Sequence, residues 1–501
     1  MESPRATTVA MVSVLAAYGS ALLLQRAAHL HADIVVATVV IALTLARAQR
    51  DADPLDRALA GLVLPPVAML AAEIGALIPR HPAVGGTLFT LAMATTVELR
   101  RFAPRVAAAG NVAALPLVAS LILPAVGTRP PDHTHTLWVG LSTLVTAVWV
   151  GAVHQVVASP RPGPRPTGAP APTGPRRRLA PSTRMALQTG LALGAAFTLG
   201  HRFWPTHWSW AVLTTYLVCA GTRGRGDALH RGVLRTAGAA AGTLLATVLG
   251  GTFAAHDAGA VPVMFALLAL GSWLRTIDYA YWAACVTAVL SLLYGYFGQP
   301  APDLLVDRLA AILLGAALGV AAAWLILPIR TVDILRRRVA DALAALTPIL
   351  AGPPGISGTP PPSDHPVHRF DAAVAALHPL EPALRAHHRL VRRRRPGPHP
   401  VQAIDAVRAC VGPAHRLAEA APGHTPTAEA RTAVAANVGA VRRAIGRRPG
   451  TPYRPLPTTR GTPGNPLADL DAALACLATI FRPAAPRPAN KHPDEAERAP
   501  G

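Results

Sequence analysis

The stretch Thr206-His-Trp-Ser-Trp-Ala-Val-Leu-Thr-Thr-Tyr216 is followed by Arg231-Gly-Val-Leu-Arg235 and then by Gly238-Ala-Ala-Ala-Gly242. In this order an aromatic-rich segment precedes a short apolar helix, an arginine-rich turn and a glycine-striped helix. Tryptophan is enriched where helices meet the membrane surface, and glycines four residues apart allow two membrane helices to approach closely. The stretch therefore predicts a helical membrane protein and indicates where a solute could pass.

The composition agrees with a membrane protein that has a soluble tail. Of the 501 residues, 51% are hydrophobic, and the mean hydropathy is +0.34. Apolar blocks of about 15–22 residues, the length that crosses a bilayer core, recur from Met1 to about Arg330. After Arg330 they give way to Pro, Arg, Ala and His.

We expect an all-α membrane protein with about twelve transmembrane helices, arranged as two six-helix repeats, and a C-terminal cytoplasmic helical domain. The first half is residues 1–158, a Pro/Arg-rich linker is 159–181, the second half is 182–330, and the tail is 331–501. The expected spans are 7–29, 32–46, 58–78, 82–99, 106–126, 137–158, 183–202, 208–221, 232–251, 260–274, 279–297 and 308–328.

The arginines indicate how the chain lies in the membrane. They cluster in alternate loops, as the positive-inside rule requires, and this pattern explains the net charge of +21 without a nucleic-acid partner. Both termini and the linker are therefore expected in the cytoplasm, with the spans in the plasma membrane.

The two halves resemble each other. His31-Ala-Asp-Ile-Val-Val-Ala-Thr38 parallels His207-Trp-Ser-Trp-Ala-Val-Leu-Thr214, and Asp53-Pro-Leu-Asp-Arg57 parallels Asp227-Ala-Leu-His-Arg231. Six spans per half is an even number, so the repeats would share one orientation about an axis along the membrane normal. Chance similarity between sequences rich in Ala, Leu and Val is the alternative.

Arg231, Arg235, Gly238 and Gly242 follow a spacing that places them on one helical face. Guanidinium groups bind carboxylates through paired hydrogen bonds, and the glycines would bring a second helix close. The face therefore predicts an anion-gathering entrance. The alternative is an ordinary positive-inside pair followed by a packing face. Similar glycine pairs at Gly190/Gly194 and Gly315/Gly319 are consistent with tight packing and with a homodimer.

Carboxylates inside the expected spans are scarce. Glu73 is the clearest. Burial there would raise the pKa of its carboxyl group, and a role in proton coupling follows as a hypothesis. The alternative is a hydrated position near the outer interface. Asp278 lies at the inner end of the eleventh span, and we assign it to proton coupling as well.

Trp204, Trp208 and Trp210 flank the outer ends of two spans. Anchoring at the membrane interface is the default interpretation of such residues, and a stacking surface for aromatic solutes is the alternative.

Enzyme chemistry is not expected. No nucleophile–base arrangement or phosphate-binding glycine loop is visible, the four cysteines form no CxxC pair, and no cofactor is implied. His133 and His135, placed in an outer loop, lack a third metal ligand.

Three segments resemble the fusaric-acid-resistance / aromatic acid exporter family: Arg184-Met-Ala-Leu-Gln188, His207-Trp-Ser-Trp-Ala-Val-Leu-Thr214 and Arg231-Gly-Val-Leu-Arg-Thr-Ala-Gly-Ala-Ala-Ala-Gly242. The family pattern has Trp-Ala-x-Leu/Ile-Thr, a short turn, and Arg-Gly-x-x-Arg-x-x-Gly-Thr-x-x-Gly. Here Ala239 replaces the usual Thr after the glycine. The likeness is good over residues 182–330 and weaker over 1–158.

The resemblance implies transport, since many members export aromatic carboxylic acids and plant relatives conduct organic anions. We therefore expect a secondary transporter that exports aromatic or amphipathic organic anions. A passive anion channel and a membrane scaffold that acts through its tail are the alternatives. The expected substrate-binding residues are Arg231, Arg235, Trp208, Trp210 and Arg184.

The tail is expected to contain helices at 329–350, 367–391, 400–421, 427–446 and 466–481. Arg392 to Arg395 would form a solvated turn or bind anionic lipid headgroups. Segments 449–465 and 483–501 have the composition of disordered chain.

Overall fold

A computed structural model of the chain consists of helices and irregular segments, with no strand in the part that it describes. The model divides into two compact units, one that runs to Thr331 and one that begins at Val332. The described residues are 4–50, 52–122, 133–157, 180–222, 224–250, 252–298, 302–328, 331–351, 365–391, 399–420, 427–456 and 465–482.

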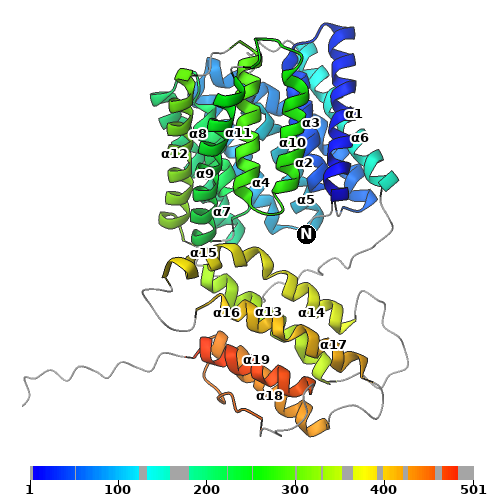
Figure 1. The fold of residues 1–501 in the computed structure, drawn as a ribbon, viewed down its shortest axis with the longest axis vertical. Helices are drawn as coiled ribbons and strands as arrows, with labels where there is room; N and C mark the ends of the chain where they lie inside the picture. The colour runs from blue at the N-terminus through cyan, green and yellow to red at the C-terminus, as the bar shows by residue number, and fades with distance from the viewer. Residues whose placement is uncertain are drawn as a thin grey trace, which may run out of the picture. The chain divides into compact units, whose positions relative to one another are not determined.

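The first unit is a bundle of helices (Figure 1). They are α1 (Pro4–Ala28), α2 (Ala32–Ala48), α3 (Pro54–Arg80), α4 (Pro82–Glu98), η1 (Leu99–Arg101), α5 (Pro104–Ser120), α6 (His133–Val157), α7 (Pro181–Phe203), α8 (Ser209–Cys219), α9 (Arg225–Gly250), α10 (Ala260–Leu274), α11 (Tyr279–Tyr296) and α12 (Pro302–Leu325). Prolines at the first helical turn begin several of them, because a proline there loses no helical hydrogen bond.

Five helices in the described part are long and apolar enough to cross a membrane: Arg5–Ala28, Pro54–Arg80, Thr134–Val157, Arg225–Leu249 and Val306–Leu325. The other expected spans are shorter or more polar. The shortest, α8, would extend only about 16 Å at 1.5 Å per residue. Most of its residues are buried inside the bundle, so α8 has little surface to offer to lipid.

The two units differ in what they expose. Leu23, Leu62, Val156, Val248 and Leu325 of the first unit are each at least two-thirds exposed. In the described part of the second unit, the only exposed large hydrophobic residue is Val332, at its boundary. An apolar exterior suits a lipid environment, whereas the surface of the second unit suits water.

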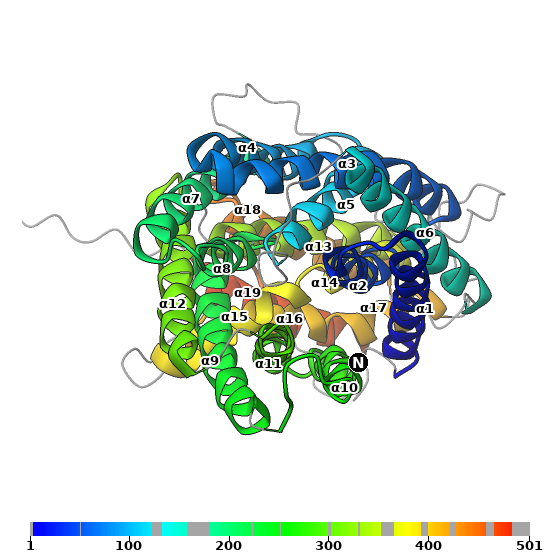
Figure 2. The ribbon, with the colours of Figure 1, turned by 90° about the horizontal axis from the view of Figure 1, so that it is seen from above.

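Helix packing in the first unit repeats with an offset of six helices. Helix α1 packs on α2 and α6 as α7 packs on α8 and α12, and α3 packs on α5 and α6 as α9 packs on α11 and α12. The two sets meet at α4 with α7 and at α1 with α10, on opposite sides of the unit (Figure 2).

Each of these two contacts contains an edge-to-face aromatic pair. Tyr18 and Phe265 join α1 to α10 at a centroid distance of 4.9 Å and an interplanar angle of 67°. Phe89 and Phe197 join α4 to α7 at 5.4 Å and 66°. Edge-to-face contact is a favoured geometry for aromatic rings, so the same stabilising contact occurs at both places where the sets meet.

The glycine stripe of α9 packs against α11, as its spacing predicts. A Cβ atom at Gly242 would clash with the Ala284 carbonyl and would lie 2.8 Å from the Thr287 Cβ. The Gly315/Gly319 stripe likewise packs on α8. In the third stripe, a Cβ at Gly190 would lie 3.6 Å from the Ala94 Cβ of α4, whereas nothing lies within 4 Å of a Cβ at Gly194. Each stripe thus contacts another helix of the chain, and of the stripe glycines Gly194 is the one with open space beside it.

We predict opposite effects for one substitution at two glycines. Gly242→Ala should lower the free energy of unfolding by about 1–3 kcal/mol, because the methyl group overpacks a backbone contact. Gly194→Ala should leave that free energy unchanged or raise it by up to about 1 kcal/mol, since alanine favours the helix. Unfolding of the two purified variants in detergent measures both effects. Equal destabilisation would contradict the α9–α11 contact.

The second unit has helices α13 (Thr331–Ala351), α14 (Pro366–Ala375), η4 (His378–Leu380), α15 (Glu381–Val391), α16 (Gln402–Ala409), α17 (Val411–Glu419), α18 (Ala428–Ile445) and α19 (Pro466–Ile480). They enclose one core, with Leu335, Phe370, Val407 and Leu474 fully buried.

Two expected tail helices are each divided in the structure. Segment 367–391 breaks into α14, η4 and α15, and segment 400–421 breaks into α16 and α17. Pro379, Pro382 and Pro413 lie at or just after these breaks. A proline supplies no amide hydrogen and clashes with the preceding turn, which explains both interruptions.

Several predictions fall wholly or mostly outside the described residues. They concern the linker up to residue 179, Arg392 to Arg395, residues 483–501, and residues 457–464 of the segment 449–465. Residues 449–456 of that segment are described, and the expectation of disordered chain is wrong for them. The Tyr453 hydroxyl donates to the Asp471 carbonyl at 3.1 Å, and the Leu456 amide donates to the Asp471 carboxylate at 2.8 Å.

Three histidines of the second unit form a cluster. His399 lies 3.1 Å from His387 between ring nitrogens, and its ring lies 4.5 Å from that of His388 between centroids. Partial burial lowers the pKa of His399 to about 4, and the neighbouring His388 and His387 contribute to this shift. In the folded unit His399 is therefore neutral at physiological pH.

We predict that acid loosens this cluster. Below the unfolded-state pKa of about 6.5 the unfolded chain binds a proton that folded His399 rejects, so stability falls as the pH drops towards 4. Hydrogen-exchange protection of α15 and α16 in the full chain, corrected for intrinsic exchange, should decrease between pH 7 and 4. His399→Gln should flatten this dependence, and an unchanged slope in that variant would refute the assignment.

Candidate functional site

A cavity of 660 Å³ lies inside the first unit. Its walls come from α1, α2 and α5 on one side and from α8, α9, α10 and α11 on the other. Residues from Tyr279 to Phe297 line it along the length of α11, roughly 27 Å at 1.5 Å per residue. Most of the wall is aliphatic or aromatic, with Val36, Leu43, Met264, Phe265 and Leu268 among the lining residues.

Four arginines line this cavity: Arg47, Arg231, Arg235 and Arg275. They come from the last turn of α2, from α9, and from the residue after α10. The Arg47 guanidinium donates to the Ser272 hydroxyl at 2.6 Å. Its Cζ lies 3.9 Å from the ring centroid of Trp282, near the start of α11. These arginines therefore contribute positive charge from three elements to an otherwise apolar cavity.

Arg235 is the most buried of the four, with 3% of its surface exposed. Its Nε atom is buried and has no hydrogen-bond partner. Ion pairs in the described residues do not involve Arg235. A buried guanidinium is costly in an apolar bundle unless it is paired or hydrated. The cavity gives this group the space in which an anion or water can meet it.

Arg231 lies one helical turn before Arg235 and is half-buried. It donates to the carbonyl of Ala220, just after α8, and its Cζ lies 6.0 Å from the Tyr279 ring centroid. The Gly238 and Gly242 contact holds α9 against α11 and so fixes both arginines beside Tyr279. The predicted arginine–glycine face thus positions an arginine pair at the cavity wall.

Trp208 and Trp210 do not line the cavity. They are 6% and 5% exposed, so the expectation that they anchor the protein at the membrane interface is wrong for both. Trp208 packs with Phe197, Phe89 and Met93 in a core between α4, α5, α7 and α8. When the helices are matched with an offset of six, this core corresponds in position to the cavity.

Trp210 belongs to a second arginine cluster. Its Nε1 donates to the Tyr294 hydroxyl at 2.8 Å. Arg308, which is 4% exposed, has its Cζ 5.5 Å and 5.8 Å from the ring centroids of Trp210 and Tyr294. Arg308 also donates to the Ser291 hydroxyl at 2.5 Å. These contacts give Trp210 a packing role around a buried cation.

Two further predicted site residues also lie outside the cavity lining. Arg184 is in the first turn of α7, and its Nε is buried without a hydrogen-bond partner. Asp278 caps α11, because its carboxylate accepts a hydrogen bond from the Ala280 amide at 2.8 Å. The structure therefore does not bring these two residues together with Arg231 and Arg235.

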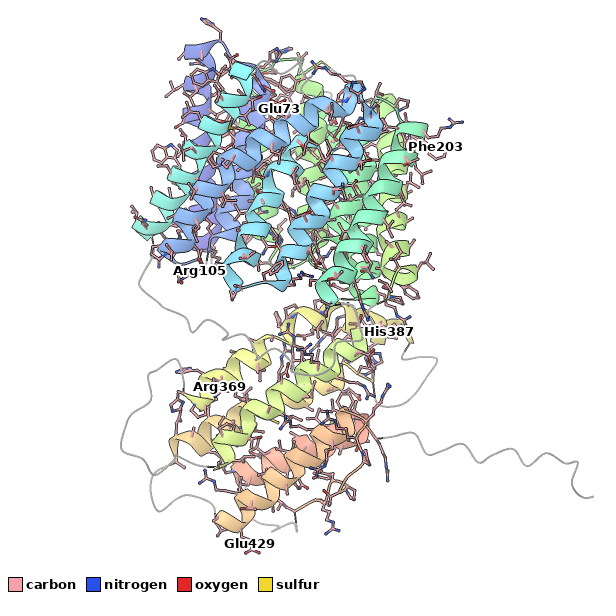
Figure 3. All side chains as sticks on the ribbon, turned by 180° about the vertical axis from the view of Figure 1, so that it is seen from behind. Glu73, Arg105, Phe203, Arg369, His387 and Glu429 are labelled. Atoms are coloured by element: carbon pink, nitrogen blue, oxygen red, sulfur yellow. The ribbon has the colours of Figure 1, made fainter. Side chains whose placement is uncertain are left out.

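Glu73 is exposed on α3, at the end of the unit opposite Arg105 (Figure 3). Its carboxylate accepts a hydrogen bond from the Thr136 hydroxyl at 2.6 Å. Beside Thr136, His135 contacts the buried carboxylate of Asp33 at 3.0 Å. His135 lies in helix α6, so the expectation that it belongs to an outer loop is wrong. The structure describes no cluster that could hold a metal ion.

Sequence reasoning missed Arg47, Arg275 and Trp282 as parts of the cavity. The two arginines look like ordinary positive-inside charges. Only the packing of α10 on α11, and the contacts of Arg47 with Ser272 and Trp282 of these helices, bring them to the site. The Asp33–His135 pair has no sequence signal either, because 101 residues separate its members.

The arrangement suits an amphipathic anion. Apolar walls favour a hydrocarbon or aromatic body, and guanidinium groups bind a carboxylate through charge-assisted hydrogen bonds. A 660 Å³ cavity lies within the range of about 300–1,000 Å³ that is usual for small-molecule sites.

Thiol labelling can test the charge of the cavity. In a Cys476→Ser background, Ala48→Cys near Arg47 should react about ten-fold faster with an anionic methanethiosulfonate than with its cationic analogue, because the arginines concentrate anions. Gln25→Cys, which lines the cavity from the last turns of α1, is the matched control and should show a smaller ratio. Equal ratios at the two positions would contradict the proposed charge asymmetry.

Comparison with protein families gives one match. Residues 191–322 match the family described as fusaric acid resistance protein-like. The matched segment runs from α7 into α12 and contains Arg231, Arg235 and Arg275 but not Arg47. No curated protein and no solved structure matches the chain.

The family match confirms the resemblance expected from the sequence, and the family is one of membrane transport. Together with five helices of membrane-spanning length and composition, it fits the apolar exterior of the first unit. Over residues 191–322 the chain is therefore similar to the fusaric acid resistance protein-like family, and this similarity supports a multi-pass membrane protein of the transporter or exporter type.

Proposed function

We propose that this protein is a secondary transporter that exports aromatic or amphipathic organic anions across the plasma membrane. The observation that carries the proposal is the 660 Å³ apolar cavity lined by Arg47, Arg231, Arg235 and Arg275. The solute's carboxylate would meet the guanidinium groups, and its hydrocarbon part would lie against the walls formed by α1, α2, α10 and α11.

The arginines also support a direction of transport. Arg47, Arg231 and Arg275 belong to the arginine-rich loops and helix ends that the positive-inside rule assigns to the cytoplasm. In this orientation both termini are cytoplasmic, and the arginines collect anions from inside the cell. Steering by a cluster of like charges raises the local concentration of the oppositely charged solute.

The repeated packing supports the two-repeat architecture within this proposal. Two six-helix halves related by an axis along the membrane normal account for the matching contacts of α4 with α7 and of α1 with α10. The cavity would then lie between the halves, where relative movement of the halves could expose it to each side in turn.

We assign proton coupling to an acidic group, with Glu73 of the first half as the first candidate and Asp278 of the second half as the second. The Glu73 carboxylate is hydrogen-bonded by Thr136, which follows His135 of the Asp33–His135 pair in the chain, so several titratable groups gather there. If Glu73 couples protons, Glu73→Gln should abolish the part of the export that a pH gradient drives. Full gradient-driven export in this variant would remove Glu73 from the coupling.

Transport assays with matched arginine variants test the main proposal. In proteoliposomes loaded with a simple aromatic carboxylate such as benzoate, Arg231→Gln/Arg235→Gln should slow efflux at least ten-fold, since both groups that face the carboxylate lose their charge. Arg184→Gln/Arg202→Gln is the charge-matched control, because both arginines of α7 lie outside the cavity lining, and it should transport at close to the wild-type rate.

The alternatives give different results in the same system. A passive channel would give currents that reverse at the anion's equilibrium potential and would not respond to a pH gradient. A scaffold that acts through its tail would lose function when residues 351–501 are deleted but not in Arg231→Gln/Arg235→Gln. Either result would overturn the exporter proposal.

A further inference from the structure

A recess of 540 Å³ in the second unit is lined by five arginines. Arg336 and Arg337 come from the second turn of α13, Arg442 and Arg443 come from the last turn of α18, and Arg448 follows α18. The remaining lining residues are small or apolar, and none is acidic. The packing of α13 beside the end of α18 thus brings together arginines that are more than 100 residues apart in the chain.

Three other arginines of the second unit are neutralised by carboxylates. Arg385 pairs with Glu381 at 2.7 Å, and Arg416 pairs with Asp469 at 2.5 Å. Arg408 also pairs with Glu381. In contrast, no arginine of the recess forms an ion pair with any residue that the structure describes. The recess therefore concentrates positive charge that the unit does not balance.

Protein contacts fix two of these guanidinium groups without neutralising them. Arg336 donates to the carbonyl of Ile445 at 3.1 Å and lies 5.3 Å from the ring centroid of Phe481. Arg443 donates to the Thr451 hydroxyl at 2.7 Å. The Nε atoms of both arginines are buried and have no hydrogen-bond partner. Two positioned cations thus keep unused hydrogen-bonding capacity.

The surroundings of Arg336 disfavour its positive charge, which a bound anion would stabilise. Burial lowers the pKa of its guanidinium, and the positive charge of Arg447 lowers it further. Asp333, one turn earlier on α13, offsets part of this effect but does not line the recess. Like charges held together in this way repel one another unless a ligand supplies the opposite charge.

We propose that the recess binds an anion that carries two or more phosphate groups. A single carboxylate would balance only one of the five guanidiniums. Each phosphate monoester carries a charge of about −1.5 to −2 at neutral pH and offers three acceptor oxygens to arginine. Clustered phosphate oxygens of this kind occur in free pyrophosphate-type compounds and, with one negative charge on each phosphodiester, in the headgroup of a lipid with two phosphates. Binding assays distinguish these two sources.

Calorimetric titration of the full-length protein tests the recess. In a neutral detergent, inorganic pyrophosphate should bind saturably and much more tightly than acetate. In a second arm, micelles that contain diphosphatidylglycerol should raise the unfolding temperature, and pyrophosphate should compete if both ligands use the same site. Saturation with pyrophosphate alone identifies a free ligand, and saturation with the lipid alone identifies a headgroup.

Charge-matched variants decide whether the recess is responsible. Arg337→Gln/Arg442→Gln removes two exposed recess arginines and should weaken binding at least ten-fold. Arg369→Gln/Arg389→Gln removes the same charge from exposed positions on α14 and α15 and should leave binding unchanged. Arg448→Gln, outside any helix, should weaken binding without affecting folding. The proposal is wrong if neither ligand saturates, or if the recess and control variants bind equally well.

Discussion

The structure of the first unit depends on one constraint, which is the free-energy cost of holding charged guanidinium groups inside an apolar helix bundle. Arg235 is almost fully buried, one of its nitrogen atoms has no partner, and no described carboxylate pairs with it. Such a group is tolerated where a cavity admits water or an anion. The α9–α11 glycine contact keeps Arg235 and Arg231 at the cavity wall. The same contact therefore packs the two helices closely and positions the two charges.

The two arginine clusters of the first unit show two ways in which this free-energy cost is offset. Arg308 is enclosed by aromatic rings and a serine hydroxyl, and the protein itself supplies its surroundings. Among the arginines of the cavity, Arg47 is stacked on Trp282 and Arg231 is bonded to the Ala220 carbonyl, whereas the buried Nε of Arg235 has no partner among the described residues. The first arrangement stabilises a packed core, whereas the second is available to a solute. The same contrast recurs in the second unit between paired arginines and those of the recess.

The sequence was sufficient for features that depend on local periodicity. The spacing of Arg231, Arg235, Gly238 and Gly242 defines one helical face, and that face lies where the pattern places it. Trp208 and Trp210 were misjudged, because an aromatic residue near a helix end has the same sequence pattern whether it anchors the helix at lipid or packs inside the bundle. Gly194 was also misjudged, since a glycine pair does not specify whether both of its members face the partner helix; here Gly190 lies against α4 and Gly194 does not. Arg47 and Arg275 could not be identified, because their place at the cavity follows from long-range packing.

The most direct test of the central claim is an electron cryo-microscopy map of the protein with a brominated aromatic carboxylate, compared with a map without it. We expect new density inside the cavity, with the carboxylate towards Arg231 and Arg235 and the brominated ring against the apolar wall between α2 and α11. Density for the compound only on the lipid-facing surface, with the cavity unchanged, would contradict the account.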